Sequence, residues 1–103
     1  MTTRLTALVL LLAAAGAASA QDRERLYVRS VAANCAQCHG TDGKPAAGSA
    51  LPPLAGRSRE ELVAQLQAFK NGTRAGAIMT QLSKGFTDAQ IEQIAGHFAA
   101  VKN

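Results

Sequence analysis

Cys35-Ala36-Gln37-Cys38-His39 is the stretch of this sequence that decides the fold. Two thiols lie three positions apart, and an imidazole follows at once. This spacing is the attachment signature of c-type haem, in which both sulfurs join the porphyrin covalently and the adjacent histidine reaches the iron. The sequence therefore predicts one haem c, attached through Cys35 and Cys38, with His39 as an axial ligand.

Three other interpretations of the two cysteines compete with haem attachment. A thioredoxin-like redox pair accompanies a βαβ pattern, and no alternating strand pattern is visible here. A disulfide between Cys35 and Cys38 would close a very short loop and would gain little stability from chain entropy. A structural zinc site needs four ligands, and beyond this motif only His97 is a natural donor. Haem attachment is the interpretation that these considerations favour.

The first twenty residues have the pattern of a secretory signal peptide. A head with one cation, Arg4, precedes the apolar run Leu5–Gly16, and Ala18-Ser19-Ala20 forms a small-residue cleavage site before Gln21. A membrane-spanning helix needs about 20 apolar residues, so a retained anchor is the weaker alternative. We predict a leader over 1–20, a mature domain over 21–103, export to the periplasm, and no membrane span after the leader is removed.

The mature domain has few large apolar side chains. Of its 83 residues, 35 are apolar, but 15 of these are Ala and two are Cys, which leaves 18 larger ones. Domains this small often recruit a disulfide, a metal or a cofactor. Basic residues exceed acidic ones by four in the full chain, and they are scattered rather than clustered, which argues against nucleic-acid binding. A haem would supply the missing centre of the core.

Helical signals lie both before and after the motif. The predicted class is therefore all-α. A first helix begins at Asp22 and ends near Asn34, with Leu26, Tyr27 and Val31 facing inward. Capping signatures at Ser58 and Thr87 predict a helix over 59–70 and a terminal helix. The Gly- and Pro-rich stretch from Gly40 to Gly56 and the stretch from Thr73 to Gly85 are predicted as loops, the second with room for a short helical turn.

Two further residues are candidates for the haem site. Met79 lies 40 residues after His39, far enough along the chain to present its sulfur from the opposite face of the ring. A thioether ligand would raise the potential and close the iron to other ligands. His97 is the competing donor, with a structural role in the terminal helix favoured. Ligating histidines usually donate their second ring proton to a carbonyl, and the stiff Leu51–Leu54 segment offers Pro52 for this.

These residues together resemble the class I cytochrome c family over nearly all of the mature chain. Ile78-Met79, Lys84-Gly85-Phe86 and Ala95–Phe98 are similar to the cytochrome subunit of flavocytochrome c sulfide dehydrogenases and to short cytochromes of the c553 and c4 type. The resemblance implies three to five helices around one haem with one exposed edge. No Trp is present, so the partners of the haem propionates do not carry over from the family.

The resemblance implies electron transfer rather than catalysis by this chain. One hypothesis is a mobile periplasmic carrier between redox proteins such as a flavoprotein dehydrogenase or a terminal oxidase, with exposed cations steering an acidic partner (Lys44, Lys70, Arg74 and Lys84). The alternative is a tightly bound electron-accepting subunit of a flavoprotein sulfide dehydrogenase. A haem-based gas sensor or peroxidase is a third possibility, and it requires an open iron site.

Overall fold

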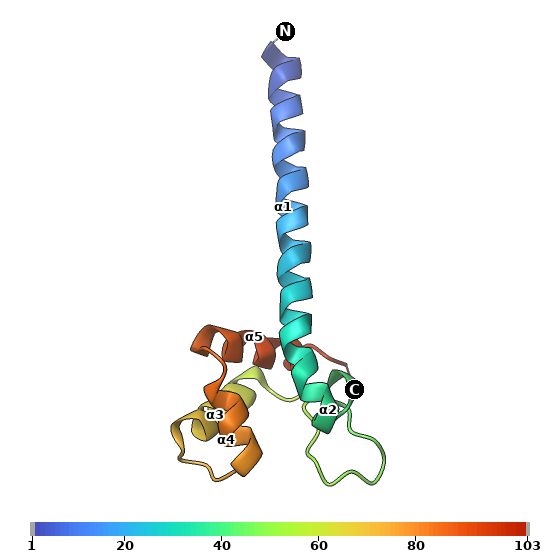
Figure 1. Ribbon diagram of the computed structural model, residues 1–103. Helices are drawn as coiled ribbons and strands as arrows, with labels where there is room; N and C mark the ends of the chain where they lie inside the picture. The colour runs from blue at the N-terminus through green and yellow to red at the C-terminus, as the bar shows by residue number, and fades with distance from the viewer. Residues whose placement is uncertain (1, 103) are drawn as a thin grey trace.

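The computed structural model describes residues 2–102, and helices are the only regular elements in this part of the chain. Its elements, drawn in Figure 1, are α1 (Thr2–Ala32), the 3-10 helix η1 (Ala33–Cys35), α2 (Ala36–His39), the 3-10 helix η2 (Thr41–Gly43), α3 (Arg59–Asn71), α4 (Ala77–Lys84) and α5 (Asp88–Ala99). No strand occurs among these residues. The predicted all-α class is therefore confirmed.

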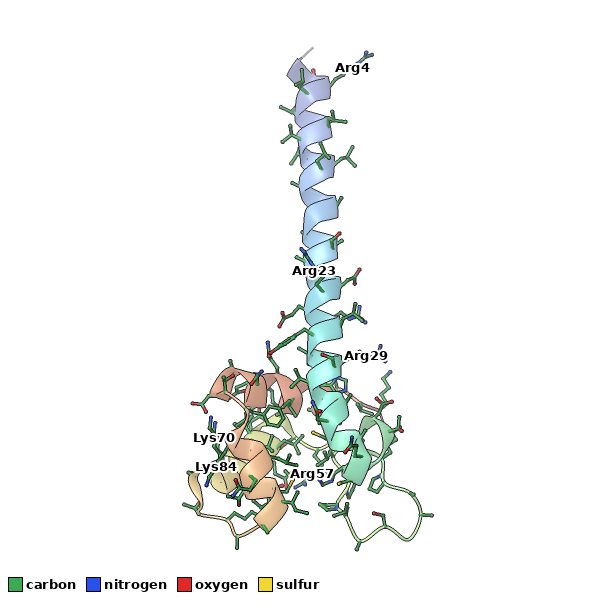
Figure 2. All side chains as sticks on the ribbon, viewed as in Figure 1. Arg4, Arg23, Arg29, Arg57, Lys70 and Lys84 are labelled. Atoms are coloured by element: carbon green, nitrogen blue, oxygen red, sulfur yellow. The ribbon has the colours of Figure 1, made fainter. Side chains whose placement is uncertain are left out.

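Helix α1 runs without a break through the predicted cleavage site, and its N-terminal part stands away from the other helices (Figure 1). Asp22 therefore lies inside a helix here rather than capping one, contrary to the sequence prediction. Side chains project from the first part of α1 on all sides (Figure 2), and those over residues 3–27 are exposed. This helical segment is apolar and long enough to cross a membrane, and a signal sequence near the N-terminus has the same properties.

The C-terminal part of α1 crosses α5 and is hydrogen-bonded to it. Gln93 Nε2 donates to Glu24 Oε1 at 2.7 Å, and Gln90 Nε2 donates to the Tyr27 hydroxyl at 2.9 Å. Val31 packs against the core, as predicted. The prediction that Leu26 and Tyr27 face inward was wrong, since they are 65% and 43% exposed, although the Tyr27 hydroxyl contacts α5 through Gln90.

Helices α3 and α5 begin where their capping residues predict. The Ser58 side chain accepts a hydrogen bond from the Glu61 amide at 3.1 Å, whereas the Glu61 carboxylate pairs with Arg57 instead of completing a capping box. Thr87 and Gln90 form both halves of a capping box at the start of α5. Each cap satisfies backbone N–H groups that the first helical turn leaves without partners.

Helix α4 lies in the stretch that was predicted as a loop. Gly76 and Gly85, two of the three glycines around Ile78-Met79, are the residues that flank this helix. The Thr80 amide donates to the Gly76 carbonyl at 2.9 Å and closes the first turn. The stretch from Thr73 to Gly85, predicted as a loop with room for a short helical turn, thus holds a longer helix than predicted over Ala77–Lys84, because the glycines at its two ends act as helix boundaries.

A small core holds these helices together. The buried apolar cluster combines α1, α3 and α5 (Ala32, Leu62, Ile94, Ala95 and Phe98). Between α3 and α5, the Asp88 carboxylate accepts hydrogen bonds from Gln67 at 3.0 Å and from Lys70 at 2.8 Å, and both contacts lower the pKa of Asp88. This arrangement leaves α2 and the loop after it on one side of the lower end of α1, and α3 with α4 on the other (Figure 1).

Candidate functional site

His39 ends α2, and its ring is held by the Pro52 carbonyl. The side chain is buried, with 8% of its surface exposed, and Nδ1 lies 2.8 Å from Pro52 O. A carbonyl oxygen only accepts hydrogen bonds, so Nδ1 carries the proton and donates it. The other ring nitrogen, Nε2, then keeps a free lone pair. This is the tautomer and the orientation that a metal-ligating histidine requires.

The two cysteines are free thiols: Cys35 ends η1 directly before α2, and Cys38 lies within α2. Cys38 is exposed, whereas Cys35 is partly buried against the core, and its burial raises the pKa of the thiol. They form no disulfide, and the described residues contain no cluster of three His, Cys, Asp or Glu side chains arranged to hold a metal ion. The disulfide and zinc interpretations therefore have no support in this geometry.

Gly43 fixes the segment that carries Pro52. Its carbonyl accepts hydrogen bonds from the amides of Leu54 at 2.8 Å and Ala55 at 3.1 Å. Its φ is +72°, and a Cβ built on it would lie 2.8 Å from Leu54 Cβ and 2.9 Å from Phe98 Cδ1. Asp42-Gly43 is a turn signal in the sequence, but the close approach of Leu54 and Phe98 to Gly43 comes from residues farther along the chain. Gly43 thus connects the His39–Pro52 contact to helix α5.

Replacing Gly43 with Ala should destabilise the holoprotein through this close packing. We expect a loss of about 1–3 kcal/mol in the free energy of unfolding beyond that of Gly48→Ala, measured by chemical denaturation. Gly48 is the matched control because its φ is +82° and nothing lies within 4 Å of its Cβ position. Equal losses in the two variants would show that only the backbone conformation matters at Gly43.

Met79 lies in the first turn of α4 and is partly buried. Because α4 packs against α3, Met79 belongs to the part of the domain across from α2 in Figure 1. One ligand candidate thus comes from each side of the lower end of α1. His39 and Met79, which are 40 residues apart in the sequence, thus lie on two different parts of the fold.

His97 belongs to a different part of the molecule. Its ring contacts Phe98 edge-on, with centroids 5.1 Å apart, and it lines two clefts beside α1. The larger cleft, of about 410 Å³, lies between α1 and the end of α5. Neither cleft is lined by His39 or by a cysteine. His97 is therefore a partly buried residue at the junction of α1 and α5.

Two of the four cations predicted to steer a partner are held within the domain. Lys70 Nζ donates at 2.8 Å both to Phe86 O and to the Asp88 carboxylate. The Arg74 guanidinium lies over the Phe69 ring, 4.7 Å from its centroid. Lys44 and Lys84 are exposed, and neither has an ion-pair partner among residues 2–102.

The donors present fit a covalently bound haem. Two free thiols have the required spacing, and one buried imidazole directly follows them with its Nδ1 proton already bonded and its Nε2 available. Met79, on a separate helix, carries a thioether and stays a candidate for a second iron ligand. The motif and the Pro52 segment therefore offer both attachment atoms and one axial donor.

Several known proteins are similar in sequence to this chain. The chain is 42% identical over 65 residues to the cytochrome subunit of sulfide dehydrogenase from Chlorobaculum tepidum, covering 63% of this chain and 57% of that protein. It is 37% identical over 70 residues to a thiosulfate dehydrogenase electron acceptor of Stutzerimonas stutzeri, covering 65% of this chain and 32% of that protein. Cytochrome c-554(548) of Halomonas halodenitrificans is 36% identical over 69 residues, covering 64% of this chain and 82% of that protein.

The chain thus spans only part of the first two of these relatives, a little over half of one and about a third of the other. The model of the family described as Cytochrome c matches residues 24–100, which include the whole Cys-x-x-Cys-His motif, α3, α4 and α5. On this match and on the geometry of its cysteines and histidine, the chain belongs to the cytochrome c family, whose members bind haem c covalently.

Proposed function

We propose that this protein transfers single electrons in the periplasm through one haem c with histidine and methionine as axial ligands. The observation that carries the proposal is the hydrogen bond from His39 Nδ1 to Pro52 O at 2.8 Å. It prepares Nε2 of the residue that directly follows the two cysteines to bind a metal. The relatives described as a dehydrogenase subunit and as an electron acceptor support a role in electron transfer.

Each residue of the motif has a separate task in this proposal. Cys35 and Cys38 hold the porphyrin through thioether bonds, and His39 binds the iron through Nε2. The Pro52 carbonyl accepts a hydrogen bond from His39 Nδ1–H, which fixes the orientation of the ring and raises the basicity of Nε2. When bound, the haem supplies a one-electron iron couple. The chain itself then determines which side chains bind the iron, how far water reaches the haem, and which surface partners meet. We assign no catalytic residue to it.

Met79 is the proposed sixth ligand. Its thioether favours ferrous iron and so raises the reduction potential relative to two histidines. Its position on α4, which packs against α3, holds the sulfur on a regular element rather than on a loop. Such an iron has no open coordination position, and this favours outer-sphere electron transfer over gas sensing or peroxidase chemistry.

We also propose that residues 1–20 are a leader that is removed after export. The apolar run Leu5–Gly16 is itself shorter than the roughly 20 apolar residues of a membrane span, although the continuous helix that contains it is long enough to cross a membrane. A helix that began at Gln21 would carry Asp22 and Glu24 in its first turn, where acidic side chains favour a helix start. The hydrogen bond from Gln93 to Glu24 would then hold that first turn against α5.

Two kinds of partnership are open to this electron carrier. A mobile carrier meets larger redox proteins transiently, whereas the sulfide dehydrogenase relative favours a second candidate, a subunit that stays bound to a flavoprotein. Chromatography of the native protein at high salt separates them. A single haem-containing chain supports the mobile carrier, and a flavoprotein that remains bound supports the subunit.

Carbon monoxide provides the direct test of a closed iron site. We expect the ferrous wild-type protein to bind carbon monoxide weakly or not at all at neutral pH, because Met79 would have to be displaced. The visible spectrum monitors binding. Ready formation of a carbon monoxide complex would contradict ligation by Met79 and would favour a gas sensor or a peroxidase.

A further inference from the structure

Gln21 is the residue that removal of the leader would place at the start of the mature chain. The small-residue site Ala18-Ser19-Ala20 directly precedes it. Cleavage there would free the α-amine of a residue whose side chain ends in a primary amide. The amine nitrogen, Cα, Cβ, Cγ and the amide carbon Cδ can then close a five-membered ring, which has little strain.

The Gln21 amide is free to reach that amine. Gln21 is exposed on α1, and its side chain has no hydrogen-bond partner among residues 2–102. Figure 2 shows Arg23, two residues later, on the part of α1 that stands clear of the other helices. By contrast, the Gln93 amide is held by Glu24 at 2.7 Å. The fold therefore provides no contact that would keep the Gln21 amide away from its own amine.

A charged amine at Gln21 would lie in an unfavourable place. Helix α1 is continuous up to Ala32, so cleavage would leave a helix that starts near Gln21. The positive end of the helix dipole disfavours a cation there and favours Asp22 and Glu24. The lactam formed by ring closure is neutral, and it costs no helical hydrogen bond because the N–H groups of a first turn have no partner in the helix. The fold therefore favours the cyclised N-terminus over the charged one.

We propose that Gln21 is a modification site, at which the N-terminus of the exported protein cyclises to pyroglutamate. The inference rests on the leader removal put forward under the proposed function. The neutral α-amine nitrogen attacks Cδ of its own side chain. The N–Cδ bond forms, the Cδ–Nε2 bond breaks, and Nε2 leaves as ammonia with one proton from the amine. No electron is transferred, and no co-reactant is needed. The product has no free α-amine, so the start of the chain is closed to aminopeptidases.

Mass spectrometry and N-terminal sequencing of the exported holoprotein test this step. Fresh protein should have the mass of residues 21–103 plus one haem and should give the sequence Gln-Asp-Arg. During incubation at neutral pH, the mass should fall by about 17 Da, the mass of ammonia, and the sequencing signal should be lost. The incubation lasts until a synthetic peptide of residues 21–34 has cyclised completely.

Gln21→Asn is the matched control, because it keeps a side-chain amide that is one methylene too short for this ring. It should keep its sequencing signal throughout the incubation. The sequencing signal also separates Gln21 from Asn71, which precedes Gly72. Attack of the Gly72 nitrogen on the Asn71 amide would likewise release ammonia, but it would leave the N-terminus open.

The possible outcomes separate this modification from the proposed function. A wild-type N-terminus that stays open to the end of the incubation would overturn the modification, and so would an equal loss of signal in Gln21→Asn. A sequence that begins at another residue would overturn the leader boundary and the modification together. A cyclised protein without a reversible iron couple would overturn electron transfer but support the modification of Gln21.

Discussion

Met79→Leu is expected to keep the haem but to lower its reduction potential and open the iron. Leucine has nearly the size of methionine but no sulfur, so the side chain still fills its place on α4 without binding the metal. The potential should fall by on the order of 0.1 V, a fraction of the roughly 0.8 V range that axial ligands span. Redox titration measures this change, and the variant should bind carbon monoxide when the wild type does not.

His97→Leu is the control for this experiment, because His97 is the other histidine of the chain. Its ring contacts Phe98 at the junction of α1 and α5, so its loss should leave the potential and the carbon monoxide behaviour unchanged. The opposite pattern, with an unchanged potential in Met79→Leu and a lower one in His97→Leu, would identify His97 as the ligand.

Cys35→Ala and Cys38→Ala together should abolish haem retention and, with it, stable folding. The described core buries only a few large apolar side chains (Leu62, Ile91, Ile94 and Phe98). A domain of about 80 residues or fewer with a single core rarely gains more than about 3–5 kcal/mol from it, and residues 21–103 are only slightly longer, so we expect the loss of a large apolar cofactor to remove most of this stability. Circular dichroism and the visible spectrum of the exported protein measure both losses.

Gln37→Ala is the matched control for the cysteine pair, since Gln37 is exposed and lies between the two thiols on α2. It should retain the haem and the wild-type helix content. A colourless double cysteine variant that melted cooperatively with full helix content would show that the polypeptide folds without its cofactor, and the argument from the thin core would then be wrong.

Local signals in the sequence predicted the capped helices well. Thr87 and Ser58 mark the starts of α5 and α3, because a helix start depends on side-chain contacts within four residues. The same approach failed at α4, where glycine is the N-cap and no side chain provides a signal. It also failed for Leu26, because the contact of α1 with α5 depends on residues more than sixty positions apart, such as Tyr27 and Gln90.

The candidate site likewise contains residues that the sequence predicts and residues that only the packing of the helices reveals. The motif from Cys35 to His39 is local, so its spacing alone predicts haem attachment. The role of Gly43 could not be read from spacing, since it depends on the approach of Phe98 from the other end of the chain. The partners of Lys70 likewise depend on the packing of α3 against the segment from Phe86 to Asp88. The contact of Arg74 with the Phe69 ring depends on how the chain turns back after α3.

The mass of the denatured, exported protein tests the central claim most directly. Covalent attachment survives denaturation, whereas a haem bound only through axial ligands is lost. We predict the mass of residues 21–103 plus one haem, with the added mass confined to the fragment that contains Cys35 and Cys38. The mass of the polypeptide alone, from a protein that is folded and colourless, would contradict the account.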